Sequence, residues 1–229
     1  MEINKKLLES LILDKISDKY TASYGDSDYL IYNNKNEIYN VEFRIRIQYL
    51  RLLTFEGFSI FSSKKIEKEI SNLIIEPLKN YYSNNFYFSS IRFYKTNYNF
   101  SQEINSEEQL TEFINEFIKC LEYHEKEIFP KLLDIKFLAE YVGSVPFEHQ
   151  SEIPIGGSFP VHLFKKLAVL KWGNQTERYF EYKKETKILI EKYAIKKPDK
   201  YTHEIKENFE KLVHHLENEP NPFKKNNVC

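Results

Sequence analysis

Residues 41–49, Val-Glu-Phe-Arg-Ile-Arg-Ile-Gln-Tyr, alternate apolar and polar side chains without interruption. Because successive side chains of a β-strand point to opposite faces, the apolar residues from Val41 to Tyr49 would all share one face. This alternation is typical of an antiparallel sheet that has one buried and one solvated face. We therefore predict an antiparallel sheet around this stretch, with Tyr49 on its buried side.

The neighbouring sequence predicts further elements of an α+β region. Apolar spacing predicts a helix over residues 2–18, followed by short strands separated by turns. A further strand follows and ends at about Phe61, with Gly57 as a bulge or turn. A second helix follows, and Pro77 should kink or restart it because proline removes a backbone donor. The alternation from Phe86 to Asn97 predicts one more strand.

After Asn99 the pattern predicts helices and no strand. Ser106-Glu107-Glu108-Gln109 is a capping box, in which the Ser and Gln side chains satisfy each other's backbone donors, and it begins an acidic helix. Residues 144–159 form a long irregular connection with two prolines and two glycines inside it, a kind of segment that is often functional. Three later helices are predicted, at about 160–172, 176–195 and 200–217.

These elements together predict an α+β fold with two regions. Residues 1–100 would form an N-terminal antiparallel sheet with two helices, and residues 101–217 an all-helical half packed on it. Residues 218–229 would be a disordered tail.

Charge is segregated along a chain whose formal net charge is only −1. Residues 101–128 contain eight Glu against two Lys, and residues 164–200 contain eleven Lys or Arg against five acids. Each segment is a candidate docking surface, although the two could also neutralise each other by packing together. The basic segment carries interleaved acids, which makes the acidic helix the stronger candidate.

The acidic helix has a predicted buried stripe and a predicted outer face. Leu110, Phe113, Ile114, Phe117 and Leu121 recur at helical spacing and should point inward. The candidate partner-binding residues lie away from this stripe and are Glu108, Glu112, Glu116 and Glu122.

Motifs for common catalytic chemistry are missing from the sequence. The six histidines lack the paired spacing of a zinc helix, and no cysteine pairs exist for a structural zinc site, so no metal ligands are assigned. Gly156-Gly157 precedes a helix without a phosphate-binding Lys or a dinucleotide fingerprint, and no cofactor is expected. We assign no catalytic residue and expect a protein that is not an enzyme.

An alternative site lies in the irregular connection. Glu148, His149 and Glu152 could form a cluster in which carboxylates hold and tune an imidazole. Residues 144–159 would then act as a lid over a ligand or substrate pocket between the sheet and the C-terminal helices.

Nucleic-acid and membrane partners are not favoured. Arg44 and Arg46 share a sheet face, as Arg92 and Tyr94 would on another strand, but nucleic-acid binders usually have a net basic domain. No stretch reaches the roughly 18 apolar residues of a membrane span. With two cysteines, Cys120 at an apolar helix position and Cys229 in the tail, a reducing cytoplasm is the expected location.

The order of elements resembles a set of uncharacterised bacterial proteins, some of which are similar to immunity proteins of polymorphic toxin systems. The resemblance covers residues 105–195 and includes Ile128-Phe129-Pro130-Lys131-Leu132-Leu133-Asp134-Ile135, the short helix Leu167–Asn174 and the helix that begins near Tyr179. It implies a protein that acts by binding, commonly by presenting an acidic surface to a basic toxin domain. It transfers no functional residue, because the shared pattern consists of packing residues and helix ends.

Overall fold

A computed structural model describes residues 3–24, 28–83, 100–198 and 203–224, and the side chains of 56–60 and 100 are not among those described. The chain divides into two compact units, each built from two separate segments. Unit 1 comprises Met1–Ser63 and Tyr87–Pro130, and unit 2 comprises Lys64–Phe86 and Lys131–Cys229. The acidic helix thus belongs to the same unit as the sheet, and not to the later helices with which residues 101–217 were expected to group it.

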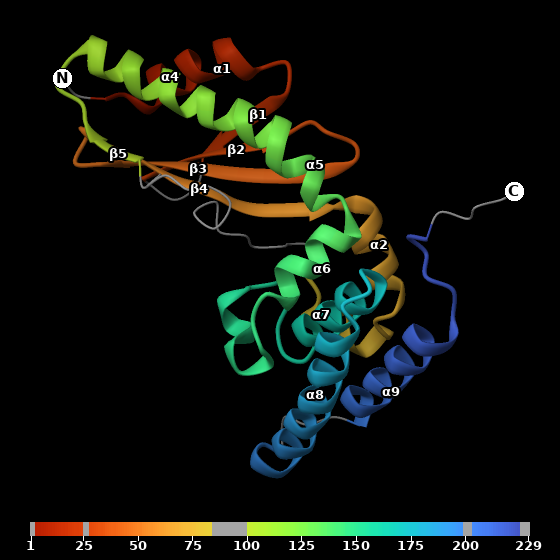
Figure 1. Ribbon diagram of the computed structural model, residues 1–229. Helices are drawn as coiled ribbons and strands as arrows, with labels where there is room; N and C mark the ends of the chain where they lie inside the picture. The colour runs from red at the N-terminus through yellow and green to blue at the C-terminus, as the bar shows by residue number, and fades with distance from the viewer. Residues whose placement is uncertain (1–2, 25–27, 84–99, 199–202, 225–229) are drawn as a thin grey trace, which may run out of the picture. The chain divides into compact units, whose positions relative to one another are not determined.

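Unit 1 is built on an antiparallel sheet whose strands follow one another in chain order, β1-β2-β3-β4-β5. Helices α1 (Lys5–Ile16) and α4 (Glu107–Tyr123) lie along the same side of this sheet (Figure 1). The strands are β1 (Tyr20–Tyr24), β2 (Tyr29–Asn34), β3 (Tyr39–Gln48), β4 (Leu52–Ser63) and β5 (Phe100–Glu103).

The alternation of β3 is confirmed over most of its length. Val41, Phe43, Ile45 and Ile47 are buried, and the polar residues between them are partly exposed. Phe43 lies at the centre of an aromatic cluster, with ring centroids 5.0–5.4 Å from those of its neighbours Tyr32, Tyr20 and Phe117. This cluster joins the sheet to α4, and such aromatic pairs add to the stabilisation from burial.

One prediction about β4 is confirmed, and one about the region of β5 is wrong. The β3–β4 pairing shifts from Phe43–Phe58 to Ile45–Phe55, so the predicted irregularity at Gly57 is confirmed as a bulge. The expectation of no strand after Asn99 is wrong, because β5 pairs with β4 from Leu52 to Phe55. With only four residues, β5 is too short for a clear alternation in the sequence.

Tyr49 is a correction to the predicted strand. It follows β3 in the turn to β4, with φ +52°, and is 89% exposed. The apolar alternation of the sequence extends to Tyr49, but the strand ends at Gln48. The left-handed backbone of Tyr49 then turns its side chain away from the buried face of the sheet.

The acidic helix α4 begins at a side-chain cap and ends in a π-helical turn. The Ser106 hydroxyl accepts from the Gln109 N–H at 3.2 Å, as predicted, but the Gln109 side chain accepts from Asn105 N–H and not from Ser106. At its other end α4 continues through a π-helical turn, η2 (His124–Ile128), into α5 (Phe129–Leu132), with Pro130 in the first turn of α5.

Unit 2 is helical in its described residues and is centred on α7 (Val161–Trp172), most of whose residues are buried. Gly173 follows α7 and lies so close to α6 that a Cβ built there would be 2.1 Å from Ala139 Cβ. The other elements are α2 (Lys64–Asn72), η1 (Glu76–Tyr81), α6 (Ile135–Gly143), η3 (Phe147–Glu152), α8 (Thr176–Lys196) and α9 (His203–Asn218).

The later helices match their predicted ranges to within a few residues. As expected, helical structure begins again at Pro77, which lies in the first turn of η1. The connection 144–159 is more ordered than predicted, since it contains the 3₁₀ helix η3. The start of the predicted tail is also ordered: Asn221 donates to the Trp172 carbonyl at 2.7 Å, and Phe223 packs on the Trp172 ring.

The fold class is α+β, with an N-terminal antiparallel sheet and a mostly helical C-terminal half, as predicted. The strand predicted over 86–97, with Arg92 and Tyr94, lies outside the described residues. So do the last five residues of the predicted tail.

Candidate functional site

The four glutamates predicted to bind a partner lie together on the outer side of α4. Glu108, Glu112 and Glu122 are exposed and Glu116 is partly exposed. Counted at 100° per residue, the four positions fall within about a third of the helix circumference. The opposite side is buried and consists of Leu110, Phe113, Ile114, Phe117, Cys120 and Leu121. We call the four glutamates the α4 acidic face.

The charge of the α4 acidic face is only partly neutralised within the chain. Lys119 lies on the same side of the helix and forms an ion pair with Glu116. Within the described part of the chain, no ion pair involves Glu108, Glu112 or Glu122. Three exposed carboxylates that form no ion pair with any described residue therefore stand on a helix held by the Ser106 cap and by buried aromatic residues.

Glu125, from the same acidic segment, has a structural role. Its carboxylate accepts from Lys19 Nζ at 2.7 Å and from the Tyr20 hydroxyl at 2.9 Å. The hydrogen bond to Glu125 raises the pKa of Lys19, and burial together with the Glu125 charge raises the pKa of Tyr20. The π-helical turn thus fastens the end of α4 to β1, and Glu125 is not available to a partner.

Cys120 and His124 form a buried pair that sequence reasoning missed, although their i,i+4 spacing was a signal. Cys120 Sγ lies 3.6 Å from His124 Nδ1, which is also 2.8 Å from the Cys120 carbonyl oxygen. Burial raises the pKa of Cys120 to about 12 and lowers that of His124 to about 4. Both side chains are neutral at pH 7, whereas a nucleophilic cysteine needs a thiolate.

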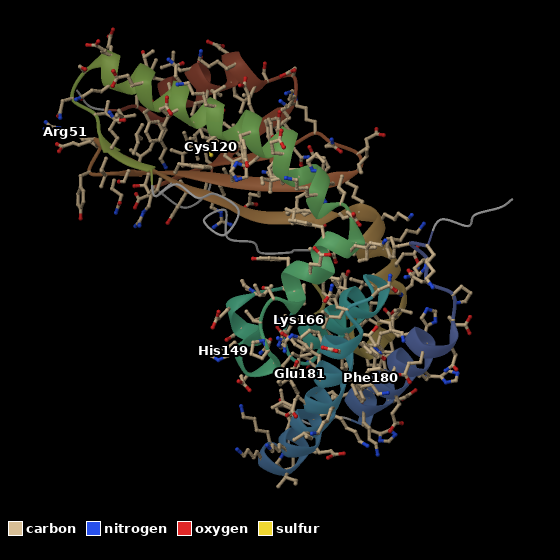
Figure 2. The ribbon with its side chains drawn as sticks, viewed as in Figure 1. Arg51, Cys120, His149, Lys166, Phe180 and Glu181 are labelled. Carbon is tan, nitrogen blue, oxygen red and sulfur yellow. The ribbon has the colours of Figure 1, made fainter. Side chains whose placement is uncertain are left out.

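The alternative site residues, Glu148, His149 and Glu152, all lie on η3 and are exposed. His149 Nδ1 is 2.9 Å from a Glu152 carboxylate oxygen, so two of the three do come together. Figure 2 shows His149 at the outer side of this segment. The pair is a surface contact in which each side chain is about half exposed.

The inward contacts of η3 are made by Phe147 and Gln150, which were not among the candidate site residues. Glu181 of α8 accepts from the Phe147 N–H at 2.7 Å. Lys166 of α7 donates to the side-chain oxygen of Gln150 at 2.6 Å and to its backbone carbonyl. These bonds hold η3 against α7 and α8.

Lys165, next to Lys166, belongs to a second buried polar cluster in unit 2. Its Nζ lies 2.9 Å from a Glu67 carboxylate oxygen and donates to the Ser83 carbonyl at 2.9 Å. The Tyr82 hydroxyl also donates to Glu67. Burial lowers the pKa of Lys165, and the Glu67 charge opposes that shift. The cluster is enclosed, and its role is to join α2 to α7.

The basic segment is a weaker surface than its composition suggests. Lys165 and Lys166 are buried, with exposed fractions of 0% and 1%, and contribute no surface charge. Lys183 pairs with Glu217 at 2.6 Å, and Arg178 pairs with Glu181. Several of its cations are therefore neutralised within unit 2.

A groove of about 570 Å³ lies between α8 and α9 in unit 2. Its apolar lining includes Ile190, Phe209 and Val213. Its rim carries both lysines and glutamates, so it has no single electrostatic preference.

Two further findings apply to residues 3–24, 28–83, 100–198 and 203–224. They contain no group of three or more His, Cys, Asp or Glu placed to hold a metal ion. None of the helices found there is both long enough and apolar enough to cross a membrane. In comparisons with known proteins, no family model, no curated protein and no solved structure matches the chain.

Proposed function

We propose that this chain is a non-catalytic protein that binds another protein through the α4 acidic face. One observation carries the proposal: three exposed carboxylates without ion-pair partners in the described chain stand on one side of a firmly anchored helix. A rigid, charged surface of this kind favours fast and specific association with a surface of opposite charge.

The proposed partner is a basic protein. An immunity-type inhibitor that neutralises a basic toxin domain, as implied by the resemblance described above, is the specific form of this proposal. Such inhibitors need no catalytic group. The neutral, buried state of Cys120 and His124 supports a binding role over cysteine catalysis.

The alternative is a small-ligand protein or enzyme whose pocket is covered by residues 144–159. It has less support, because Glu148, His149 and Glu152 are exposed, and because their neighbours in η3 make the inward contacts.

The test begins by identifying the partner and then measures its affinity. A photo-cross-linking residue at Asn115, an exposed position within the α4 acidic face, captures the partner in the cell that makes the protein. The captured protein is then purified and titrated with wild type and with the variant E108K/E112K. We expect the variant to bind at least about tenfold more weakly, and the wild-type affinity to fall as salt is raised.

The matched control is E148K/E152K, which makes the same change in net charge at exposed positions of η3. We expect it to bind within about twofold of wild type. Equal affinity of E108K/E112K and wild type for the captured protein would refute the α4 acidic face as the binding surface.

A further inference from the structure

The turn between β3 and β4 has an unusual pair of residues at its tip. Tyr49 and Leu50 have φ angles of +52° and +58°, and the Arg51 N–H donates to the Gln48 carbonyl at 3.1 Å. Two central residues with positive φ are the pattern of a type I′ turn, which strongly prefers Asn-Gly or similar pairs. Two bulky residues there cost conformational free energy, because their Cβ atoms crowd the backbone in the left-handed region.

Burial does not compensate for this strain. Tyr49 is 89% exposed and Leu50 is 53% exposed, so both side chains extend into solvent. Backbone strain of this kind concentrates at functional positions, where a side chain must be presented in a fixed way. Within the described residues, the strained tip therefore leaves most of Tyr49 and about half of Leu50 exposed.

The backbone of the tip is held from both sides. The Leu50 carbonyl accepts from the Ile3 N–H at 2.8 Å, and the Arg51 carbonyl accepts from the Ile104 N–H at 2.9 Å. Ile3 and Ile104 are themselves buried, with exposed fractions of 2% and 0%. The tip is thus fixed in place before any partner binds, which reduces the ordering cost of binding.

The tip lies at the same end of unit 1 as the start of the α4 acidic face. Ile104 is two residues before Ser106, which caps α4, and Glu108 lies in the first turn of that helix. Figure 2 shows Arg51, next to the tip, at this end of the unit, and Figure 1 shows β5 leading from there into α4. The apolar tip and the first turn of the α4 acidic face therefore lie at the same end of unit 1, where one partner could reach both.

We infer that Tyr49 and Leu50 form the apolar anchor of the proposed interface and fill an apolar pocket on the same basic protein partner. This inference rests on the proposed function. It adds an apolar contact to the charge complementarity of the α4 acidic face. Tyrosine is enriched among the residues that dominate interface energies, whereas exposed charges mainly set encounter rate and specificity. The tip therefore determines how long the complex lasts.

The test replaces the tip with the residues that this turn prefers, in the variant Y49N/L50G. Relief of strain should raise the melting temperature by about 2–4 °C. Its affinity for the protein cross-linked at Asn115 should fall at least about tenfold, mainly through faster dissociation. A variant that is more stable than wild type and binds less tightly cannot owe the loss to misfolding.

The control is Ile38→Ser, because Ile38 is another apolar side chain of unit 1 that is 62% exposed, in the turn between β2 and β3. It should bind as wild type does. Wild-type affinity of Y49N/L50G, with weak binding of E108K/E112K, would overturn the anchor and leave the proposed function standing. Wild-type affinity of both variants would overturn both. Binding of wild type, but not of Y49N/L50G, to phosphatidylglycerol vesicles in place of the captured protein would overturn the anchor in favour of a membrane contact.

Discussion

The imidazole Nδ1 of His124 lies 2.8 Å from the carbonyl oxygen of Cys120, one helical turn earlier, and both residues are buried, Cys120 on the inner side of α4 and His124 directly after it. Burial lowers the pKa of His124 to about 4, against 6.5 for an unperturbed histidine. Between these two pH values the unfolded chain binds a proton at this position and the folded chain does not. Protonation therefore favours the unfolded state.

We predict from this that unit 1 loses stability as the pH falls from about 6.5 to about 4. The loss from His124 alone is roughly 3 kcal/mol, at about 1.4 kcal/mol for each pH unit between the two pKa values. Urea unfolding of wild type and His124→Gln at several pH values measures it, because glutamine can still donate to the Cys120 carbonyl but does not titrate. Parallel pH profiles for the two proteins would contradict the prediction.

Lys166 predicts a second pH dependence, in the alkaline range. Burial lowers its pKa to about 8 from the model-peptide value of 10.5, so the unfolded state binds the extra proton between these values. The free energy of unfolding should therefore rise as the pH increases from about 8 towards 10.5. Lys166→Met should lack this contribution, which appears as a smaller slope in the same urea titrations. An equal or steeper slope for the variant would contradict the assignment.

The buried pair of Lys165 and Glu67 predicts strongly non-additive substitutions. Lys165→Met leaves the Glu67 carboxylate buried without its cation and should destabilise unit 2 by about 3–5 kcal/mol. The double variant K165M/E67L removes both charges and should recover part of that loss. Chemical unfolding of the two single variants and the double variant measures the coupling energy, and simple additivity would show that the pair does not act as a unit.

The close approach of α6 to Gly173 predicts a steric effect. In Gly173→Ala the new Cβ would lie 2.1 Å from Ala139 Cβ and 2.6 Å from the Ile135 carbonyl oxygen, so the helices would have to separate. We expect a loss of about 2–3 kcal/mol, as is usual for overpacking. The control is Gly143→Ala, whose nearest atoms are flexible side-chain carbons of Arg178 and Leu170 at 3.3 Å. A thermal shift no larger than that of the control would refute this account.

Periodicity predicted β3 and α4 because burial follows one face of each of these two elements. The alternation of residues 41–47 is satisfied in β3, and the apolar stripe of α4 is buried as the spacing requires. β5 could not be predicted, because four residues show too little periodicity and its pairing with β4 is a long-range contact. Tyr49 was assigned to the wrong environment because a left-handed turn ends the strand before the apolar alternation ends.

The candidate site was predictable in part for the same reason. A helix with one buried side must expose the other, so the outward placement of Glu108, Glu112 and Glu122 followed from the stripe alone. The burial of Lys165 and Lys166 could not be foreseen, because their acceptors come from distant segments that hold Glu67 and Gln150. From the composition of residues 164–200 alone, both lysines were expected to add positive charge to the surface.

The chain passes between its two units three times, at about residues 63, 86 and 130. During synthesis the first four strands emerge early, but α4 and β5 emerge only after the 64–86 excursion into unit 2 has left the ribosome. Until α4 has been made, the apolar face of the early strands lacks this helix as a cover, and transiently exposed apolar surface of this kind favours aggregation. For the same reason, a single truncation cannot separate either unit from all residues of the other, and an isolated unit 1 would need residues 64–86 replaced by a linker.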